Sequence, residues 1–175
     1  MSRPGPEAEA ASVENAVRSF ADRVDHPLMV VTVADDRGDL SGCLAGFVTQ
    51  CSIRPPRYVV CISKLNHTYF VAEQAKAIAL HLLGEEQTEL ASLFGERSGD
   101  AICKFDQVGW HRGSMGAPVL DDCAAWLEGG VLDRFSVGDH EAFLIRPASG
   151  GSGSYDGILT LKGAPDFDPG HPAVP

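Results

Sequence analysis

Residues 42–56 read GCLAGFVTQCSIRPP, a strand-like mixture of polar and apolar residues that is interrupted by glycine and ended by proline. The pattern predicts one long strand over residues 40–51, broken by Gly42 and Gly46. Glycine inside a strand weakens it, and often marks a bulge or a place where another group approaches the backbone closely. The two prolines at residues 55–56 then end the pairing. This stretch therefore predicts a strand whose backbone is closely approached by another part of the chain or by a ligand.

Strand-like and helix-like segments alternate irregularly on both sides of this stretch. The apolar, β-branched runs at residues 28–34 and 57–63 predict strands, and residues 35–39 predict the hairpin turn between the first of them and the glycine-broken strand. Further strands are predicted over residues 77–83, 124–135, 140–147 and 158–162, and helices over residues 13–24, 66–74 and 85–94. This order lacks a regular βα alternation. It favours a mainly β fold, an antiparallel barrel with helical insertions.

Capping and turn residues predict where the elements and the domain end. Ser12 is the expected N-cap of the first helix, and Gly95 stands where a helix C-terminus favours glycine. The sequence GGSGS at residues 150–154 predicts a flexible link. The predicted organisation is a disordered lead-in over residues 1–11, one domain over residues 12–163, and an extended Pro-rich tail over residues 164–175.

The composition disfavours several classes of partner. The formal net charge is -10 and the pI about 4.9, with no cluster of Lys and Arg, so neither nucleic acid nor an anionic membrane surface is expected. No apolar run is long enough to span a bilayer, and no signal peptide is recognisable. The five cysteines are odd in number and form no CxxC pair. This favours reduced thiols in the core and a cytoplasmic protein.

The common cofactor and nucleophile signatures are absent from the sequence. There is no GxGxxG after a strand, no GxxxxGK followed by Ser or Thr, and no GxSxG elbow. The six histidines are dispersed and none forms a pair with metal-ligand spacing, so no metal is expected. Three other segments contain the residues that favour ligand binding.

The first segment, SKLNHT at residues 63–68, lies between a predicted strand and a predicted helix. A helix N-terminus presents unpaired N–H groups and a partial positive charge, which suit an anion such as a phosphate. The side-chain donors in this segment are Ser63, Lys64, Asn66, His67 and Thr68. Simple helix capping by Asn66, with a solvated Lys64, accounts for the same residues and is the commoner arrangement.

The second segment is the end of the glycine-broken strand, and it comprises Gly46, Phe47, Val48, Thr49, Gln50, Cys51 and Ser52. Backbone and short polar side chains of a strand can bind the edge of a flat heteroaromatic ring. An edge strand with Thr49 and Ser52 facing water is the alternative.

The third segment, Gly138-Asp139-His140, is an acidic tight turn that opens a predicted strand. A histidine in this place can point into a cavity and donate to a reduced ring or to a bound nicotinamide. In the alternative, Asp139 satisfies its own turn backbone and His140 is incidental.

Taken in order, these segments resemble the flavin reductase-like FMN-binding family over about residues 26–147. The anchors are residues 42–56, 63–68, 87–91, 94–95, 104–105, 110, 116–120, 125–127 and 138–140. The resemblance implies a six-stranded antiparallel split β-barrel, usually a homodimer, with flavin near the subunit interface. Residues 44–46 and Gln50 depart from the residues that many members carry, which implies fewer side-chain contacts to the ring.

The resemblance also implies roles for the three segments. Residues 46–52 would line the isoalloxazine ring of FMN, with FAD as the alternative flavin, and the donors of residues 63–68 would hold the phosphate. NADH or NADPH would reduce the flavin near His140, which Asp139 orients, and the reduced flavin would serve a flavin-dependent oxygenase or another acceptor. The expected activity is that of an NAD(P)H:flavin oxidoreductase. Two alternatives stay open, a flavin-binding electron-transfer or sensor protein of the same fold, and a barrel that holds a deazaflavin or haem.

Overall fold

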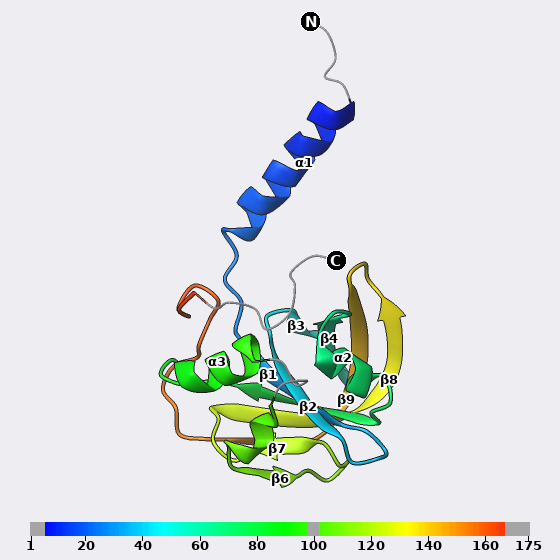
Figure 1. Ribbon diagram of the computed structural model, residues 1–175, viewed down its shortest axis with the longest axis vertical. Helices are drawn as coiled ribbons and strands as arrows, with labels where there is room; N and C mark the ends of the chain where they lie inside the picture. The colour runs from blue at the N-terminus through cyan, green and yellow to red at the C-terminus, as the bar shows by residue number, and fades with distance from the viewer. Residues whose placement is uncertain (1–5, 98–101, 167–175) are drawn as a thin grey trace, which may run out of the picture.

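A seven-stranded antiparallel sheet forms the body of the protein (Figure 1). The computed structural model describes residues 6–97 and 102–166, with side chains from residue 11 onward. The strands of the sheet are β1 (Met29–Ala34), β2 (Leu40–Ala45), β3 (Val48–Ile53), β4 (Pro56–Ser63), β5 (Ala77–Leu82), β8 (Ala125–Ser136) and β9 (His140–Ser152). They lie in the order β2-β1-β5-β8-β9-β4-β3, and every neighbouring pair is antiparallel.

The two edges of this sheet are joined by a very short piece of chain. β2 stands at one edge and β3 at the other, yet only Gly46 and Phe47 separate them in the sequence. Because consecutive Cα atoms are only about 3.8 Å apart, the two edges must lie close together and the sheet curls into a barrel. The N–H of Cys61 in β4 donates to the backbone oxygen of Phe47 at 3.0 Å and fixes this link. The predicted antiparallel barrel with helical insertions is confirmed, but its sheet has seven strands where the resemblance implied six.

Smaller elements pack around the barrel. They are α2 (His67–Ala72), α3 (Thr88–Glu96), the 3₁₀ turn η1 (Lys104–Asp106), and a two-stranded sheet of β6 (Trp110–Arg112) and β7 (Pro118–Leu120). Helix α1 (Pro6–Ala21) precedes the barrel and stands away from it in Figure 1. Within residues 6–97 and 102–166, no helix combines the length and apolar character that crossing a bilayer requires.

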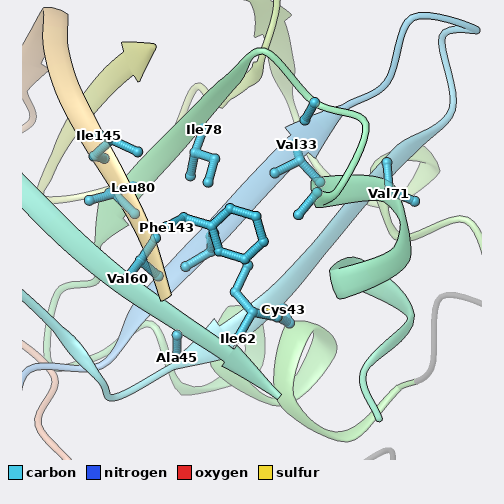
Figure 2. Packing of buried hydrophobic residues seen from close by; sticks show 13 residues of the cluster. Val33, Cys43, Ala45, Val60, Ile62, Val71, Ile78, Leu80, Phe143 and Ile145 are labelled. Atoms are coloured by element: carbon cyan, nitrogen blue, oxygen red, sulfur yellow. The ribbon is translucent and has the colours of Figure 1, made fainter. Parts of the chain in front are cut away.

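The main core fills the inside of the curled sheet. Figure 2 shows Phe143 of β9 among aliphatic side chains that include Val33 from β1, Ile62 from β4 and Ile78 from β5. All four are at most 2% exposed. Burial of each such side chain contributes about 1.5–3 kcal/mol, so the inward-facing positions of these strands hold the barrel together.

A second apolar cluster lies where α3 packs on β2. Phe94 and Phe105 meet edge to face, with ring centroids 5.9 Å apart. A Cβ atom at Gly42 would come within 2.8 Å of the Phe94 ring and 2.9 Å of the Val31 oxygen, so only glycine allows α3 to lie this close. Lys104 closes the cluster by donating to the backbone oxygens of Gly42 (2.9 Å) and Phe94 (3.1 Å), and burial lowers its pKa to about 8. The close approach predicted from Gly42 is therefore that of Phe94.

Two strand predictions are wrong. The single strand expected over residues 40–51 is divided into β2 and β3, because the chain passes from one edge of the sheet to the other at Gly46 and Phe47. Described residues 158–162 form no strand, and Thr160 makes only an isolated bridge with Pro27.

The prediction of a flexible link over residues 150–154 is also wrong for residues 150–152. β9 continues to Ser152, and Gly151 lies opposite Trp126 of β8. A Cβ atom at Gly151 would come within 2.7 Å of the Trp126 indole nitrogen. Glycine here makes room for a large cross-strand neighbour and does not loosen the chain.

The predicted helix ends differ from the structure as well. α1 begins at Pro6 and not after Ser12, so residues 6–11 are helical; proline suits the first helical position, and the Ala and Glu residues that follow favour helix. α3 continues through Gly95 to Glu96, and a Cβ atom at Gly95 would come within 3.2 Å of the Leu44 side chain. Residues 1–5 and 167–175 of the expected lead-in and tail lie outside the described residues. The domain division stays a prediction.

The cysteines divide between core and surface. All five are free thiols in the structure. Cys43 and Cys123 are buried, and burial raises the pKa of each to about 11. Cys51 and Cys103 are exposed, so the prediction of core thiols holds for only part of the set.

A buried carboxylate organises the segment between β6 and β7. Glu128 of β8 is fully buried, and its carboxylate accepts hydrogen bonds from the hydroxyls of Ser114 (2.8 Å) and Ser149 (3.1 Å). It also accepts from the backbone N–H groups of Met115 (3.0 Å) and Ala117 (3.1 Å). One side chain thus accepts from three residues of this loop and from Ser149 of β9.

The substitution Glu128→Ala is expected to lower the free energy of unfolding by about 2–4 kcal/mol, because it leaves buried donors without an acceptor. Glu128→Gln keeps the shape and one acceptor oxygen, so its loss should be smaller. Urea unfolding of the two variants and the parent protein measures both effects. An unchanged midpoint for Glu128→Ala would contradict this role.

Candidate functional site

The first and third segments singled out in the sequence meet Phe47 of the second at one end of the barrel, whereas residues 49–52 follow β3 away from it along β4. In the pairing of β4 with β9, Ser63 lies directly opposite His140. The turn between β8 and β9 therefore stands beside the start of the segment at residues 63–68. Phe47, which precedes β3, meets the same turn through the ring of His140. Strand register thus gathers residues that are far apart in the sequence.

His140 is held in place by contacts on two sides. Its Nδ1 lies 2.8 Å from the Asp139 carboxylate, and its ring packs edge to face on Phe47 with centroids 5.5 Å apart. A carboxylate only accepts hydrogen bonds, so Nδ1 carries the proton and Nε2 is the nitrogen that remains to meet a ligand. The side chain of His140 is 23% exposed, whereas that of Asp139 is 63% exposed. The predicted orientation of His140 by Asp139 matches this geometry.

The backbone of the turn explains why Asp139 and His140 stand there. Gly138 has φ +102°, a conformation that glycine adopts without strain. The N–H of Val137 donates to the His140 oxygen at 3.0 Å and closes the turn. The hydrogen bond with His140, followed by its charge, lowers the pKa of Asp139.

Lys64 ties the turn to the end of β4. Its backbone N–H donates to the Asp139 oxygen at 3.0 Å. Its ammonium donates to the Ser136 hydroxyl (2.5 Å) and the Gly138 oxygen (2.8 Å), and lies 3.8 Å from the Glu141 carboxylate. The sequence predicted Lys64 as an anion donor, and gave no sign of Ser136 or Glu141 as its partners.

The rest of the segment at residues 63–68 shows the capping arrangement. The Asn66 side chain accepts from the Thr68 N–H at 2.9 Å and caps α2, while the Ser63 hydroxyl accepts from the Leu65 N–H at 3.3 Å. The hydroxyl of Thr68 is buried and bonds Ser41 of β2 at 3.0 Å. Ser63, Asn66 and His67 are half-buried at the surface. Direct contact of these residues with a phosphate stays a prediction.

β3 forms an exposed edge of the sheet. Thr49, Gln50 and Cys51 are exposed, and a bulge shifts the register between Gln50 and Ser52. The Gln50 amide donates to the Ser52 oxygen at 3.0 Å, and the Ser52 hydroxyl donates to the Pro55 oxygen at 2.7 Å. The outer edge of such a strand offers unpaired backbone N–H and C=O groups. It is therefore suited to contact with a polar ring edge or with a second chain.

Comparison with known proteins identifies the family of this chain. The model of the flavin reductase-like domain matches residues 21–157. The chain belongs to the flavin reductase-like family. The resemblance predicted over residues 26–147 is thereby confirmed.

The related proteins cover the chain to different extents. An FMN reductase (NADH) from Methylorubrum extorquens (strain PA1) is 30% identical over 87% of this chain and 75% of its own length. The reductase subunit of a stachydrine N-demethylase from Rhizobium meliloti (strain 1021) is 29% identical over 77% of this chain. The chain spans 57% of that subunit and 42% of a probable flavin reductase from the same organism, about half of each.

A solved structure shows the same fold. The NADH:FAD oxidoreductase of Streptomyces globisporus C-1027 has a TM-score of 0.76 with this chain, covering 97% of this chain and 98% of that one. Its sequence identity is 22%, so the likeness shows a shared fold alone. Among residues 6–97 and 102–166, no cluster of His, Cys, Asp and Glu has the arrangement of a metal site.

The substitution His140→Ala is expected to raise the pKa of Asp139 back toward the usual aspartate value, because the hydrogen bond and the imidazole charge that lower it are removed. Carboxyl carbon NMR titrations of the parent and variant measure this change. Phe47→Leu, which leaves Asp139 and His140 in place, is the control and should leave the Asp139 pKa low. Equal pKa values in the parent and His140→Ala would show that the ring does not stabilise the carboxylate.

Proposed function

We propose that this chain is an FMN-binding flavin reductase that uses NADH or NADPH, and that works in the cytoplasm. The observation that carries the proposal is the contact of His140 with Phe47, which places a polar ring beside the strand expected to face the flavin. Membership of the flavin reductase-like family supports it, as does the name FMN reductase (NADH) of one relative. FAD is the alternative flavin, in line with the NADH:FAD oxidoreductase of the same fold.

The residues present fit such a ligand. The exposed face and edge of β3 offer short polar side chains and backbone groups for the ring, with Gly46 and Phe47 at its foot. Ser63, Asn66 and His67 are the half-buried polar side chains that we propose meet the phosphate. Lys64 gives two of its three ammonium donors to Ser136 and the Gly138 oxygen, so a contact with the phosphate would use the third.

His140 and Phe47 have separate parts in the proposed reaction. A bound flavin would supply the hydride chemistry, and the residues of this chain would supply position and electrostatics. His140 presents Nε2 for a hydrogen bond to the ligand while Asp139 holds Nδ1. The Phe47 ring supports one side of the imidazole and excludes water from it.

We further propose that two copies of the chain form a homodimer around this site. Several apolar side chains near it are exposed: Phe47 by 60%, Ile53 by 79%, Phe135 by 45% and Val137 by 48%. A second copy would cover these side chains and the open edge of β3. Light scattering tests this proposal. The measured molecular mass should be that of two chains, and the mass of one chain would contradict a homodimer.

The acceptor of the reduced flavin is proposed to be a flavin-dependent oxygenase. One relative is the reductase subunit of a stachydrine N-demethylase, which supports a partner of this kind. The acidic net charge of -10 disfavours nucleic acid as a partner.

FMN is expected to bind more tightly than riboflavin by roughly tenfold or more, since each hydrogen bond to a charged phosphate contributes about 1.5–3 kcal/mol. The substitution Ser63→Ala should narrow that difference. Ser152→Ala, at the far end of β9, is the matched control and should leave it unchanged. Calorimetric titration gives all the affinities. Equal affinities of the parent protein for both flavins would contradict the phosphate site.

His140→Ala is expected to slow the reduction of bound FMN by NADH roughly tenfold or more, because one hydrogen bond in the transition state is lost, while FMN affinity stays within about twofold. Anaerobic stopped-flow bleaching of the flavin absorbance measures the rate. Unchanged kinetics would remove His140 from the reaction. Flavin binding without any bleaching in the parent protein would instead support an electron-transfer or sensor protein.

A further inference from the structure

The ammonium of Lys64 is already surrounded by acceptors of the protein itself. A lysine ammonium has three N–H donors. Here it donates to the Ser136 hydroxyl and the Gly138 oxygen, and the Glu141 carboxylate lies 3.8 Å away. The lysine side chain is 33% exposed and that of Glu141 is 17% exposed, so the group is only partly open to water. Its hydrogen bonds are directed toward the β8–β9 turn.

Those contacts all converge on the turn that carries His140. Ser136 ends β8, Gly138 takes the positive φ of the turn, and Glu141 is the second residue of β9. The backbone N–H of Lys64 adds a further hydrogen bond to the Asp139 oxygen. Lys64 thus contacts residues on both sides of Gly138 as well as Gly138 itself.

We propose that Lys64 is a positioning residue for His140. Its ammonium clamps the β8–β9 turn against the end of β4, and the clamp keeps the imidazole on Phe47 at the angle needed to meet the ligand. This proposal rests on the proposed reductase function and adds to it a residue that acts without touching the ligand. Two of the three N–H donors of the ammonium serve the clamp, so a phosphate contact through the third is the alternative role for Lys64.

The alternatives are separated by using two flavins that differ only in the phosphate. Lys64→Met removes the ammonium and keeps most of the side-chain length, and Lys64→Arg restores a cation. With saturating flavin in single-turnover stopped flow, Lys64→Met should slow hydride transfer from NADH roughly fivefold or more with FMN and by the same factor with riboflavin. Lys64→Arg should recover most of the rate. Lys162→Met, which removes an exposed lysine elsewhere, should behave as the parent protein.

A second variant tests whether Lys64 acts through His140. In a His140→Ala background, Lys64→Met should add little further slowing, because the side chain that the clamp positions is already gone. Additive losses in the double variant would overturn the proposal. So would a Lys64→Met protein that binds FMN more weakly, binds riboflavin normally and transfers hydride at the parent rate, since that pattern identifies a phosphate ligand.

An amide-exchange measurement, which needs no activity, tests the clamp on its own. The N–H of Val137 is bonded within the turn, so its hydrogen exchange in flavin-free protein should accelerate roughly fivefold or more in Lys64→Met and return toward the parent rate in Lys64→Arg. Unchanged exchange would overturn the clamp whatever the activity. If the parent protein failed to bleach flavin with NADH, the reductase function would fall, whereas faster exchange in Lys64→Met would still support the clamp.

Discussion

The antiparallel pairing of β9 with β4 is the constraint on which the site depends. β9 is 13 residues long and pairs with β8 on one side and β4 on the other. Once Ser63 stands opposite His140, the turn before β9 must lie beside the segment that follows β4. The short link through Gly46 and Phe47 then brings the start of β3 to the same place, because the edges of the sheet meet there. Apolar burial of side chains such as Phe143 maintains this register, since a slip of one residue would turn Phe143 out of the core.

Polar contacts hold the β8–β9 turn in the place that the strand register gives it. The turn at residues 136–140 extends beyond the buried core, and its described residues are exposed or half-buried. It is held by few but directed hydrogen bonds: those of Lys64, the Val137 to His140 closure, and the Asp139 contact with the imidazole. A rigid barrel thereby carries a thinly supported turn at one end, which is a common arrangement for binding residues on loops. Glu128 is a second case in which a single side chain holds a loop, here the loop between β6 and β7, through several hydrogen bonds.

The sequence predicted the parts of this structure that depend on local pattern, and failed where distant neighbours decide. The strands near residues 29–34 and 56–63 follow from β-branched runs, whose fit to a half-buried sheet is a local property. Gly151 was misread because Trp126, its cross-strand neighbour, lies far away in the sequence. The three site segments were found from residue types and family resemblance. The clamp by Lys64 and the inward hydroxyl of Thr68 were not, because their partners depend on strand register and on the packing of α2 against β2.

The two glycines that interrupt the deciding stretch have different physical causes, which bears on where a ligand fits. Gly42 is required by packing, since any Cβ atom would collide with Phe94 and the Val31 backbone. At Gly46 the nearest heavy atom to an added Cβ is the Leu28 side chain at 3.7 Å, an ordinary contact, and the residue has no positive φ. Neither the packing of the chain nor its backbone conformation therefore demands glycine at that point. Because Gly46 stands at the foot of the exposed strand and next to Phe47, the close approach that its missing side chain permits is open to a flat ring from outside the chain.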